Sequence, residues 1–508
     1  MISPLPTPAT APLPPATEAR GLAADDAAVA MVSLFQAQKK IYARAVTGLF
    51  ATWRWSLVWA TQLLFYGLPW LLWNGRQAVL FDLGTRRFYI GPLVLYPQDF
   101  IYLTGILIIS AYALFLFTAV AGRLWCGFAC PQTVYTEIFM WVEKRIEGDR
   151  IARMKLDAAD WTVNKIGRKS AKQAVWIGLS LWTGFTFVGY FTPIHTLAAE
   201  ALALGFGPWE WFWVLFYGLA TYGNAGFLRE QVCKYMCPYA RFQGVMFDKD
   251  TLIISYDTGR GEPRGSRSRK ADPAQLGLGD CIDCTLCVQV CPTGIDIRQG
   301  LQYECIGCAA CIDVCDSVMD KMNYPRGLIR YDTQNGLAQH LTRSQRLARI
   351  FRPRVLVYSA ILAAIVVGFG VSLALRPPFK VDVVRDRASL ARQVDDGQTE
   401  NIYRIQIMNT TEQPQRYSVA VLAPGLAGIQ LVAAPPIAVA PAEARWVTVA
   451  VRLPAESARA AGAGVHAIQF DVTLLGSAGA LPPADSDSAA QPAASTVVHE
   501  KSTFVVQR

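Results

Sequence analysis

Long apolar segments dominate the pattern of hydrophobic and polar positions along the chain. Five of them could each form a transmembrane helix, at 55–74, 100–120, 174–192, 209–228 and 355–375, because such a helix needs about 20 mainly apolar residues. The loop over 121–173 is rich in Lys and Arg, whereas 193–208 has neither. By the positive-inside rule, the N-terminus, 121–173 and 229–354 are predicted to be cytoplasmic, and residues after 375 lie on the opposite side.

The segment before the first apolar run has two parts. Residues 1–30 are rich in Pro and Ala and have no basic region leading into an apolar run, which predicts a disordered cytoplasmic tail rather than a signal peptide. Residues 31–54 are amphipathic and basic, which predicts a helix lying at the membrane surface. The first four apolar segments then form a predicted four-helix transmembrane region over 55–240.

The pattern changes again after the fifth apolar segment. Apolar and polar residues alternate in YRIQIMN, RYSVAVL, RWVTVAV and HAIQFDVTLL, with Pro, Gly and Asp between the runs, which is typical of short antiparallel strands. Residues 376–508 are therefore predicted to form an all-β immunoglobulin-like sandwich. This part has no cysteine for an inter-sheet disulfide, and 476–494 is predicted to be a long surface loop.

Two tandem cysteine runs mark a different module over 241–345. CIDCTLCVQVCP and CIGCAACIDVCD each have the spacing C-x2-C-x2-C-x3-C. In two-cluster bacterial ferredoxins, three cysteines of each run bind one [4Fe–4S] cluster and the fourth binds the other cluster. The predicted ligand sets are Cys281, Cys284, Cys287 and Cys315 for cluster 1, and Cys305, Cys308, Cys311 and Cys291 for cluster 2. Zinc and a disulfide framework are the weaker alternatives, because zinc sites use pairs of cysteines.

The remaining cysteines form a weak internal repeat. RLWCGFACPQ and REQVCKYMCPY each place a C-x3-C-P pair where a predicted membrane hairpin ends, which involves Cys126, Cys130, Cys233 and Cys237. Cysteines four apart share one helix face, and the following Pro is expected to end or kink the helix. Soft thiolates suit Cu(I), an iron–sulfur cluster or zinc, and the thioether of Met236 is a further copper ligand candidate. The alternative is four buried structural thiols.

Composition supports a membrane protein. The 508 residues are 52% hydrophobic and 17% charged and include 14 Trp, as expected for membrane helices with interfacial aromatic residues. The net charge of +9 lies mostly beside apolar segments, so we predict no nucleic-acid partner. None of the four histidines lies in a predicted span, which excludes a bis-histidine haem there.

At this point the sequence resembles a known family. KIYARAV, WCGFACPQTVYTEIFMWVEKRIEGDR, TYGNAGFLREQVCKYMCPYARFQ, GEPRG, MDKMNYPRGLIRY and both ferredoxin runs are similar to the cbb3-type cytochrome c oxidase accessory protein family, CcoG, also called FixG or RdxA. The resemblance covers about residues 35–475. It implies a multi-pass protein of the bacterial inner membrane, with the ferredoxin module in the cytoplasm and the C-terminal domain in the periplasm.

The resemblance also implies an activity. Members look like cupric reductases that supply Cu(I) to the oxidase, with oxidase subunits or copper chaperones as partners. The expected fold is a multi-domain membrane protein with an α-helical bundle of about five helices, an inserted α+β two-cluster ferredoxin module and the β-sandwich. The alternatives to cupric reduction as the function are a non-catalytic assembly scaffold, and an electron relay between a quinol and an unidentified partner. The sequence does not identify the electron donor.

Overall fold

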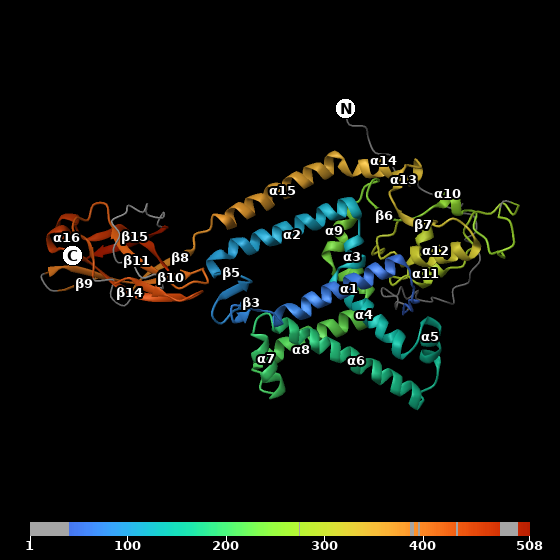
Figure 1. Ribbon diagram of the computed structural model, residues 1–508, viewed down its shortest axis with the longest axis horizontal. Helices are drawn as coiled ribbons and strands as arrows, with labels where there is room; N and C mark the ends of the chain where they lie inside the picture. The colour runs from blue at the N-terminus through green and yellow to red at the C-terminus, as the bar shows by residue number, and fades with distance from the viewer. Residues whose placement is uncertain are drawn as a thin grey trace, which may run out of the picture. The chain divides into compact units, whose positions relative to one another are not determined.

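The computed structural model describes residues 40–273, 275–386, 391–394, 397–432, 435–477 and 496–507 (Figure 1). The predicted tail over 1–30 and nearly all of the predicted loop over 476–494 lie outside these residues. By internal contacts the chain divides into a unit Met1–Ile41 and a unit Tyr42–Arg508. The elements and contacts described below belong to the second unit.

Each of the five predicted apolar segments coincides with most of a long helix. The helices are α1 (Leu49–Gly67), α2 (Phe100–Ala121), α6 (Val163–Val188), α8 (Pro208–Gly223) and α15 (Pro353–Ala374). Among the described residues, two helical stretches are long and apolar enough to cross a membrane, Pro97–Ala121 and Pro353–Ala374. Helix α8 has only 16 residues, and α6 begins with a charged half. The other three spans therefore stay a prediction.

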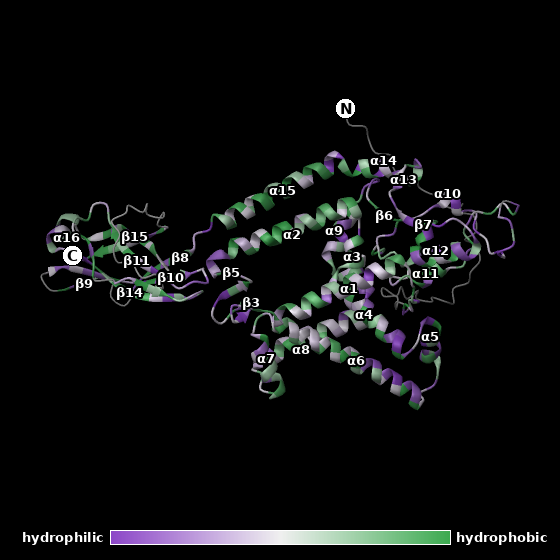
Figure 2. Ribbon diagram, viewed as in Figure 1, coloured by the Kyte–Doolittle hydropathy of each residue, from purple (hydrophilic) through white to green (hydrophobic). Residues whose placement is uncertain are grey.

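The two most apolar helices pack against each other. A Cβ on Gly105 of α2 would lie 2.8 Å from Cδ2 of Phe369 on α15, so the helices approach at a position without a side chain. The Tyr102 hydroxyl donates to the carbonyl of Ser372 at 3.1 Å. Both helices are hydrophobic over most of their length (Figure 2), and Ile101 is 72% exposed. Such outward apolar surface is what a helix facing lipid needs.

Short elements connect the long helices. They are the hairpin β1 (Leu72–Trp73) and β2 (Arg76–Gln77), the meander β3 (Val79–Asp82), β4 (Arg87–Ile90) and β5 (Leu93–Leu95), and helices α3 (Leu124–Phe128), α4 (Pro131–Ile146), α5 (Arg150–Ala158), α7 (Ile194–Leu202) and α9 (Pro238–Met246). Two π-helical turns, Asn224–Leu228 and Val232–Met236, follow α8. Four 3₁₀ turns lie at Leu68–Trp70, Pro97–Asp99, Ile297–Gln299 and Arg349–Phe351.

The chain before α1 differs from the expected surface helix. Residues 42–48 are not helical, and α1 begins only at Leu49. Their backbone groups are bound elsewhere, because the Arg44 amide donates to the Gln289 carbonyl at 2.8 Å and the Ala45 amide donates to Asp149 at 3.0 Å. This segment is therefore an extended strap that links the ferredoxin module to the N-terminus of α5. Its stabilising contacts are long-range and leave no periodic trace in the sequence.

The ferredoxin module is a small α+β unit. Strand β6 (Ile253–Tyr256) pairs antiparallel with β7 (Ile329–Asp332). Its helices are α10 (Thr258–Gly261), α11 (Leu286–Gln289) and α12 (Ala310–Met322), followed by α13 (Gln334–Ala338) and α14 (Arg343–Ala348). The buried Asp313 carboxylate on α12 accepts the amides of Phe50 and Ala51 at 3.1 and 2.7 Å. The module thus caps α1, whose first amides have no partner within the helix.

The C-terminal part is the expected sandwich of two antiparallel sheets. One sheet contains β8 (Phe379–Arg385), β9 (Arg392–Gln393), β10 (Thr399–Asn409), β12 (Gln430–Leu431) and β14 (Ala444–Leu453), in the order β12-β14-β10-β8 with β9 beside β10. The other contains β13 (Ile437–Val439), β11 (Gln415–Leu422), β15 (Gly464–Ser477) and β16 (Val497–Val506) in that order. Tyr403, Tyr417 and Phe470 are fully buried between them, and α16 (Ala455–Ala461) follows β14.

The sandwich also contacts the polypeptide between α1 and α2. The buried Asp99 carboxylate pairs with Arg376 at 2.6 Å and with Lys380. The Tyr96 hydroxyl donates to the Asn409 carbonyl at 3.0 Å. The β3–β5 meander was not predicted, because its strands have only three or four residues each. The contacts place this loop and the sandwich at the same end of α2.

Candidate iron–sulfur and thiol sites

The first predicted ligand set surrounds one cavity. Cys281 and Cys284 lie in the loop before α11, Cys287 lies on α11, and Cys315 lies one turn after Cys311 on α12. Together with apolar side chains such as Met319, these four thiols line a single cavity. The tertiary pairing of α11 with α12 is what brings the distant fourth thiol to the first loop.

The second set surrounds a second cavity. Cys305 and Cys308 lie in the loop before α12, Cys311 lies on α12, and Cys291 follows α11. These four thiols line the cavity together with apolar residues that include Ile254 and Ile306. Neither cavity has an Asp, Glu or His among its described lining residues.

The two cysteine loops share an unusual backbone conformation. Asp283 and Thr285 in the first loop, and Gly307 and Ala309 in the second, all have a positive φ between 51° and 71°. These are the residues just before and just after the second cysteine of each run, Cys284 and Cys308. Only one of the four is a glycine, so residue type does not predict this repeated turn, which L-residues adopt at a cost.

The donor set fits an iron–sulfur cluster better than a single ion. Among the described residues, no group of three or more His, Cys, Asp or Glu is arranged to hold one metal ion. Four thiols spread around a cavity are instead suited to bind a multi-atom iron–sulfur cluster. Burial raises the pKa of Cys287 to about 11 and that of Cys305 to about 12, and neighbouring thiols raise it further for Cys305. Metal coordination removes such a proton outright.

One charged side chain reaches the first cavity. Arg298 lines it and forms ion pairs with Asp283 at 2.5 Å and with Asp296 at 2.7 Å. After the larger effect of burial, this guanidinium lowers the pKa of Cys287. Asp296 acts in the opposite direction and raises this pKa, so the guanidinium and its acidic partner offset each other at the cavity.

The C-x3-C-P cysteines occupy equivalent positions in their two segments. Cys126 lies on α3 and Cys233 in the second π-helical turn, whereas Cys130 and Cys237 are the N-cap residues of α4 and α9. Each following Pro is the first residue of the new helix. The prolines therefore begin helices, where a missing N–H costs nothing. π-Helical turns are themselves frequent at functional sites.

The structure brings these four thiols together. Burial raises the pKa of Cys126 to about 11, and Cys130 and Cys237 raise it further. Burial likewise raises the pKa of Cys233 to about 12, with further increases from the other three thiols. The four thiols therefore lie within electrostatic range of one another. By contrast, the Met236 side chain is 59% exposed.

A buried amide faces the first of these thiols. Gln243 on α9 is fully buried, and its Nε2 donates to Sγ of Cys126 at 3.3 Å and to the Thr118 hydroxyl at 3.4 Å. The Thr118 hydroxyl in turn lies 2.5 Å from that of Tyr239. This chain of contacts orients the amide toward sulfur. The sequence offered no signal for it, because Gln243 follows the motif by six residues.

Replacing this amide is expected to weaken any chemistry that needs the Cys126 thiolate. A hydrogen bond to a charged group contributes about 1.5–3 kcal/mol, so Gln243→Leu should slow a reaction at this thiolate about tenfold or more. The rate of Cu(I) formation, followed with a Cu(I)-specific chelator, measures this. The exposed Gln339→Leu serves as the control, and equal rates for the two variants would refute the role.

The thiol site lies directly against the loop of cluster 2. A Cβ on Gly127, next to Cys126, would lie 2.7 Å from both Cα and N of Cys308. The Cα atoms of Cys126 and Cys308 are therefore no more than about 8 Å apart. Arg54 on α1 donates to the Cys308 carbonyl at 2.5 Å, and the Tyr331 hydroxyl donates to the Gly307 carbonyl at 2.5 Å. The loop is thus fixed from both sides.

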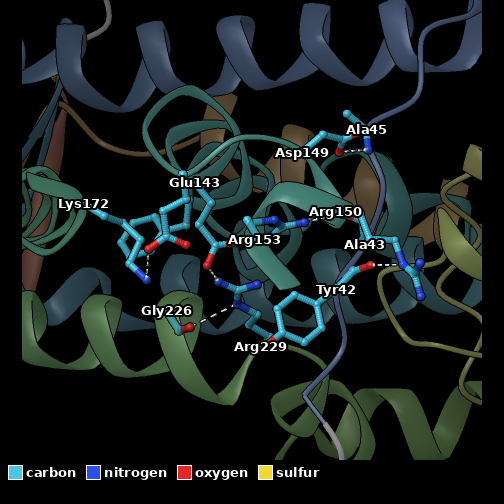
Figure 3. A network of polar contacts seen from close by, with 12 residues as sticks. Tyr42, Ala43, Ala45, Glu143, Asp149, Arg150, Arg153, Lys172, Gly226 and Arg229 are labelled. Carbon is cyan, nitrogen blue, oxygen red and sulfur yellow. Dashed lines mark hydrogen bonds and ion pairs between the residues drawn. The ribbon is translucent and has the colours of Figure 1, made fainter. Parts of the chain in front are cut away.

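A buried ion network joins the two C-x3-C-P segments from another side (Figure 3). Glu143 on α4 pairs with Arg153 at 2.6 Å and with Arg229 at 2.7 Å, and Arg229 also donates to the Gly226 carbonyl. Burial alone would raise the pKa of Glu143, but Arg229 and Arg153 outweigh it and lower the pKa. Lys172 is 5% exposed. This network was not predicted, because Arg153 and Lys172 are two of many basic residues in the loop over 121–173.

The network reaches the strap as well. Arg153 donates to the Ala43 carbonyl, and Arg150 donates to the Tyr42 carbonyl at 3.0 Å (Figure 3). Breaking a buried ion pair by removing one partner costs about 3–5 kcal/mol. The segment that holds Gln289 of the ferredoxin module is therefore anchored to α4 and α5.

Comparisons with known proteins agree with this layout. A model described as "4Fe-4S dicluster domain" matches residues 228–334, "4Fe-4S binding domain" matches 103–148, and "IG-like fold at C-terminal of FixG" matches 369–506. The "Nitrogen fixation protein FixG" of Rhizobium meliloti is 36% identical over 76% of this chain and 80% of its own length. "Protein RdxB" of Cereibacter sphaeroides is 39% identical over 77% and 83%.

A solved structure is similar to about a quarter of this chain. The crystal structure of a FixG-related protein from Vibrio parahaemolyticus is 21% identical and covers 26% of this chain and 97% of that chain, with a TM-score of 0.20.

Proposed function

The chain belongs to the FixG/RdxA family, and on that premise we propose that it is an inner-membrane iron–sulfur protein that reduces Cu(II) to Cu(I) at the four C-x3-C-P thiols. The Cu(I) would supply a cbb3-type oxidase during its assembly. Membership of this family already implies 4Fe–4S ferredoxin domains and an oxidoreductase-like role.

Eight cysteines would hold two clusters. Cys281, Cys284, Cys287 and Cys315 would hold cluster 1, and Cys305, Cys308, Cys311 and Cys291 would hold cluster 2. When bound, the clusters supply one-electron transfer. The chain contributes the apolar cavities and the fixed position of the second loop.

The contact between Gly127 and Cys308 is the observation that carries the proposal. It sets the thiol site beside the loop of cluster 2, with no side chain between the two backbones. The cavity of the first set, whose Cys284 is exposed, borders that of the second set, because Cys287 lines both. The sulfur sites therefore follow one another in the order needed to pass single electrons to a substrate at the thiols.

The thiols suit this substrate. Aqueous Cu(II) prefers nitrogen and oxygen ligands, whereas thiolates favour Cu(I). One electron converts Cu(II) to Cu(I), and the four thiols stabilise the product. Because the described thiols are not already arranged around one ion, we expect their side chains to close around copper when it binds. The exposed Met236 is left out of the site.

The same contacts support the membrane topology that we propose. Segments predicted to be cytoplasmic contact each other, as in the pairs Gly127 with Cys308 and Asp250 with Arg349. Segments predicted to be periplasmic do likewise, since Asp99 pairs with Lys380. This segregation supports the five-helix arrangement, with the ferredoxin module in the cytoplasm and the sandwich in the periplasm.

Serine substitution of Cys126, Cys130, Cys233 and Cys237 tests the proposal. The protein, purified without oxygen and reduced with dithionite, should form Cu(I) at least tenfold more slowly than wild type after removal of excess reductant. Iron should stay at about eight atoms per chain, as two [4Fe–4S] clusters require. Met236→Leu, beside the site, is the matched control and should behave as wild type. An unchanged rate in the serine variant would overturn the proposal.

A second candidate is an electron relay whose four thiols hold a third cluster. The match of a 4Fe–4S binding model to 103–148, which includes Cys126 and Cys130, favours it. Wild type would then contain about twelve irons per chain and the serine variant about eight. The same iron analysis therefore separates the two candidates.

A further inference from the structure

A third cavity lies beside the loop of cluster 2. Its walls include Cys305 and Gly307 of that loop on one side and Ala121, the last residue of α2, on another. It is similar in size to each of the two cysteine-lined cavities. The proposed cupric reduction does not use it.

The lining is mostly apolar with few polar groups. Leu124, Phe247, Leu252 and Ile297 are among the apolar residues, and Leu301, which is 39% exposed, lies at the rim. Apolar walls with a small number of placed polar groups are typical of sites for small organic ligands.

One polar group in this cavity lacks a partner. Arg123 is 8% exposed and lines the cavity, and two of its guanidinium nitrogens donate to the carbonyls of Tyr303 and Ala240. Its buried Nε has no hydrogen-bond partner among the residues that the structure describes. An unsatisfied buried donor costs about 1–3 kcal/mol, so a ligand that accepts from it gains correspondingly.

A second polar group is half satisfied. The Tyr331 hydroxyl donates to the Gly307 carbonyl, and its oxygen keeps free lone pairs that can accept a hydrogen bond. Besides Gln302, whose Nε2 already donates to the Asp296 carbonyl, the cavity therefore offers one donor on Arg123 and one acceptor on Tyr331. A phosphate would call for several charge-assisted donors, whereas a neutral ligand with one carbonyl or hydroxyl oxygen at each end of a ring needs only these two.

We propose that this cavity binds the head group of a lipid-soluble quinol. This inference rests on the proposed function and names its electron donor. The cavity lies where α2, one of the two most apolar helices, ends against the ferredoxin module, so a ligand dissolved in the membrane reaches it without leaving the lipid boundary. Oxidation of one quinol to the quinone releases two electrons and two protons. Two one-electron centres take the electrons, and water at the rim beside Leu301 takes the protons.

Photolabelling of the full-length protein with bound clusters tests the site. Under ultraviolet light, an azido-naphthoquinone should label peptides that contain 121–124 or 297–303, and excess menadione should suppress the label. Leu301→Trp, which fills the rim from an exposed position, should reduce labelling at least tenfold. Leu276→Trp is the matched control, because Leu276 is 54% exposed in the same module and does not line the cavity. Its labelling should equal that of wild type.

A kinetic readout accompanies the label. Menadiol should bleach the iron–sulfur absorption of wild type, and Leu301→Trp should slow this at least tenfold while reduction by dithionite stays unchanged. Labelling that menadione does not suppress, or that is equal in Leu301→Trp and wild type, would overturn the quinol site. Because dithionite-reduced protein can be mixed with Cu(II) without any quinol, cupric reduction is scored independently of this result.

Discussion

Gly127→Ala is expected to slow Cu(I) formation by dithionite-reduced protein at least tenfold. The new Cβ would lie 2.7 Å from the Cys308 backbone, a separation that real Cβ contacts do not show. The two backbones must move apart, and a displacement of about 1 Å in a reacting arrangement can cost about 100-fold in rate. Mixing reduced protein with Cu(II) in a stopped-flow instrument measures the effect.

Gly167→Ala provides the comparison. Gly167 lies on α6, and a Cβ there would meet nothing within 4 Å. Both variants should keep the iron content of wild type, so a slower rate in Gly127→Ala alone reports the distance between the sites. If Gly127→Ala reduces copper as fast as Gly167→Ala, the close contact is irrelevant to the reaction.

The two cysteine loops are expected to respond differently to the same substitution. Cys308→Ser and Cys284→Ser should each lower iron from about eight to about four atoms per chain. Only Cys308 belongs to the loop that contacts the thiol site. Reduced Cys284→Ser should therefore still form about one Cu(I) per chain, against about two for wild type, whereas Cys308→Ser should form almost none.

Anaerobic titration with Cu(II), with iron measured on the same samples, decides this. The opposite asymmetry, with Cys284→Ser inactive and Cys308→Ser active, would show that electrons leave from the first loop. If both variants were as active as wild type, neither cysteine set would take part in the reaction.

Local patterns were sufficient for much of the fold. The alternating segments after residue 376 form the two sheets of the sandwich, and the tandem cysteine spacing predicted sets that each line one cavity. Both signals are short repeats with a physical cause, the pleat of a strand and the reach of a tight loop. Whether those thiols bind the clusters stays a prediction that the experiments above address.

Long-range contacts were out of reach of the sequence. Arg153 and Lys172 belong to a basic loop predicted to be cytoplasmic, yet both are buried, Arg153 in an ion pair with Glu143 and Lys172 in one with Glu147. Residues 42–48 belong to a segment predicted to be an amphipathic helix, but the amides of Arg44 and Ala45 donate to Gln289 and Asp149 instead. In each case the partner lies on another element of the chain, so the periodicity of one element carries no information about it.

The partial membrane assignment has a similar cause. Helices α1, α6 and α8 do not qualify as membrane spans by length and composition. Helices α1 and α6 contain basic residues, and α8 has only 16 residues. Arg54 on α1, for example, is only 5% exposed because it donates to the Cys308 carbonyl. A charged residue that is buried by such a contact still lowers the mean hydropathy of its helix.

Electron paramagnetic resonance of the dithionite-reduced wild-type protein during titration with Cu(II) tests the central claim most directly. We predict signals of reduced [4Fe–4S] clusters that disappear as Cu(II) is added, with one Cu(I) formed for each electron lost. Reduced signals that persist in the presence of Cu(II), or anaerobically purified protein without iron, would contradict the account.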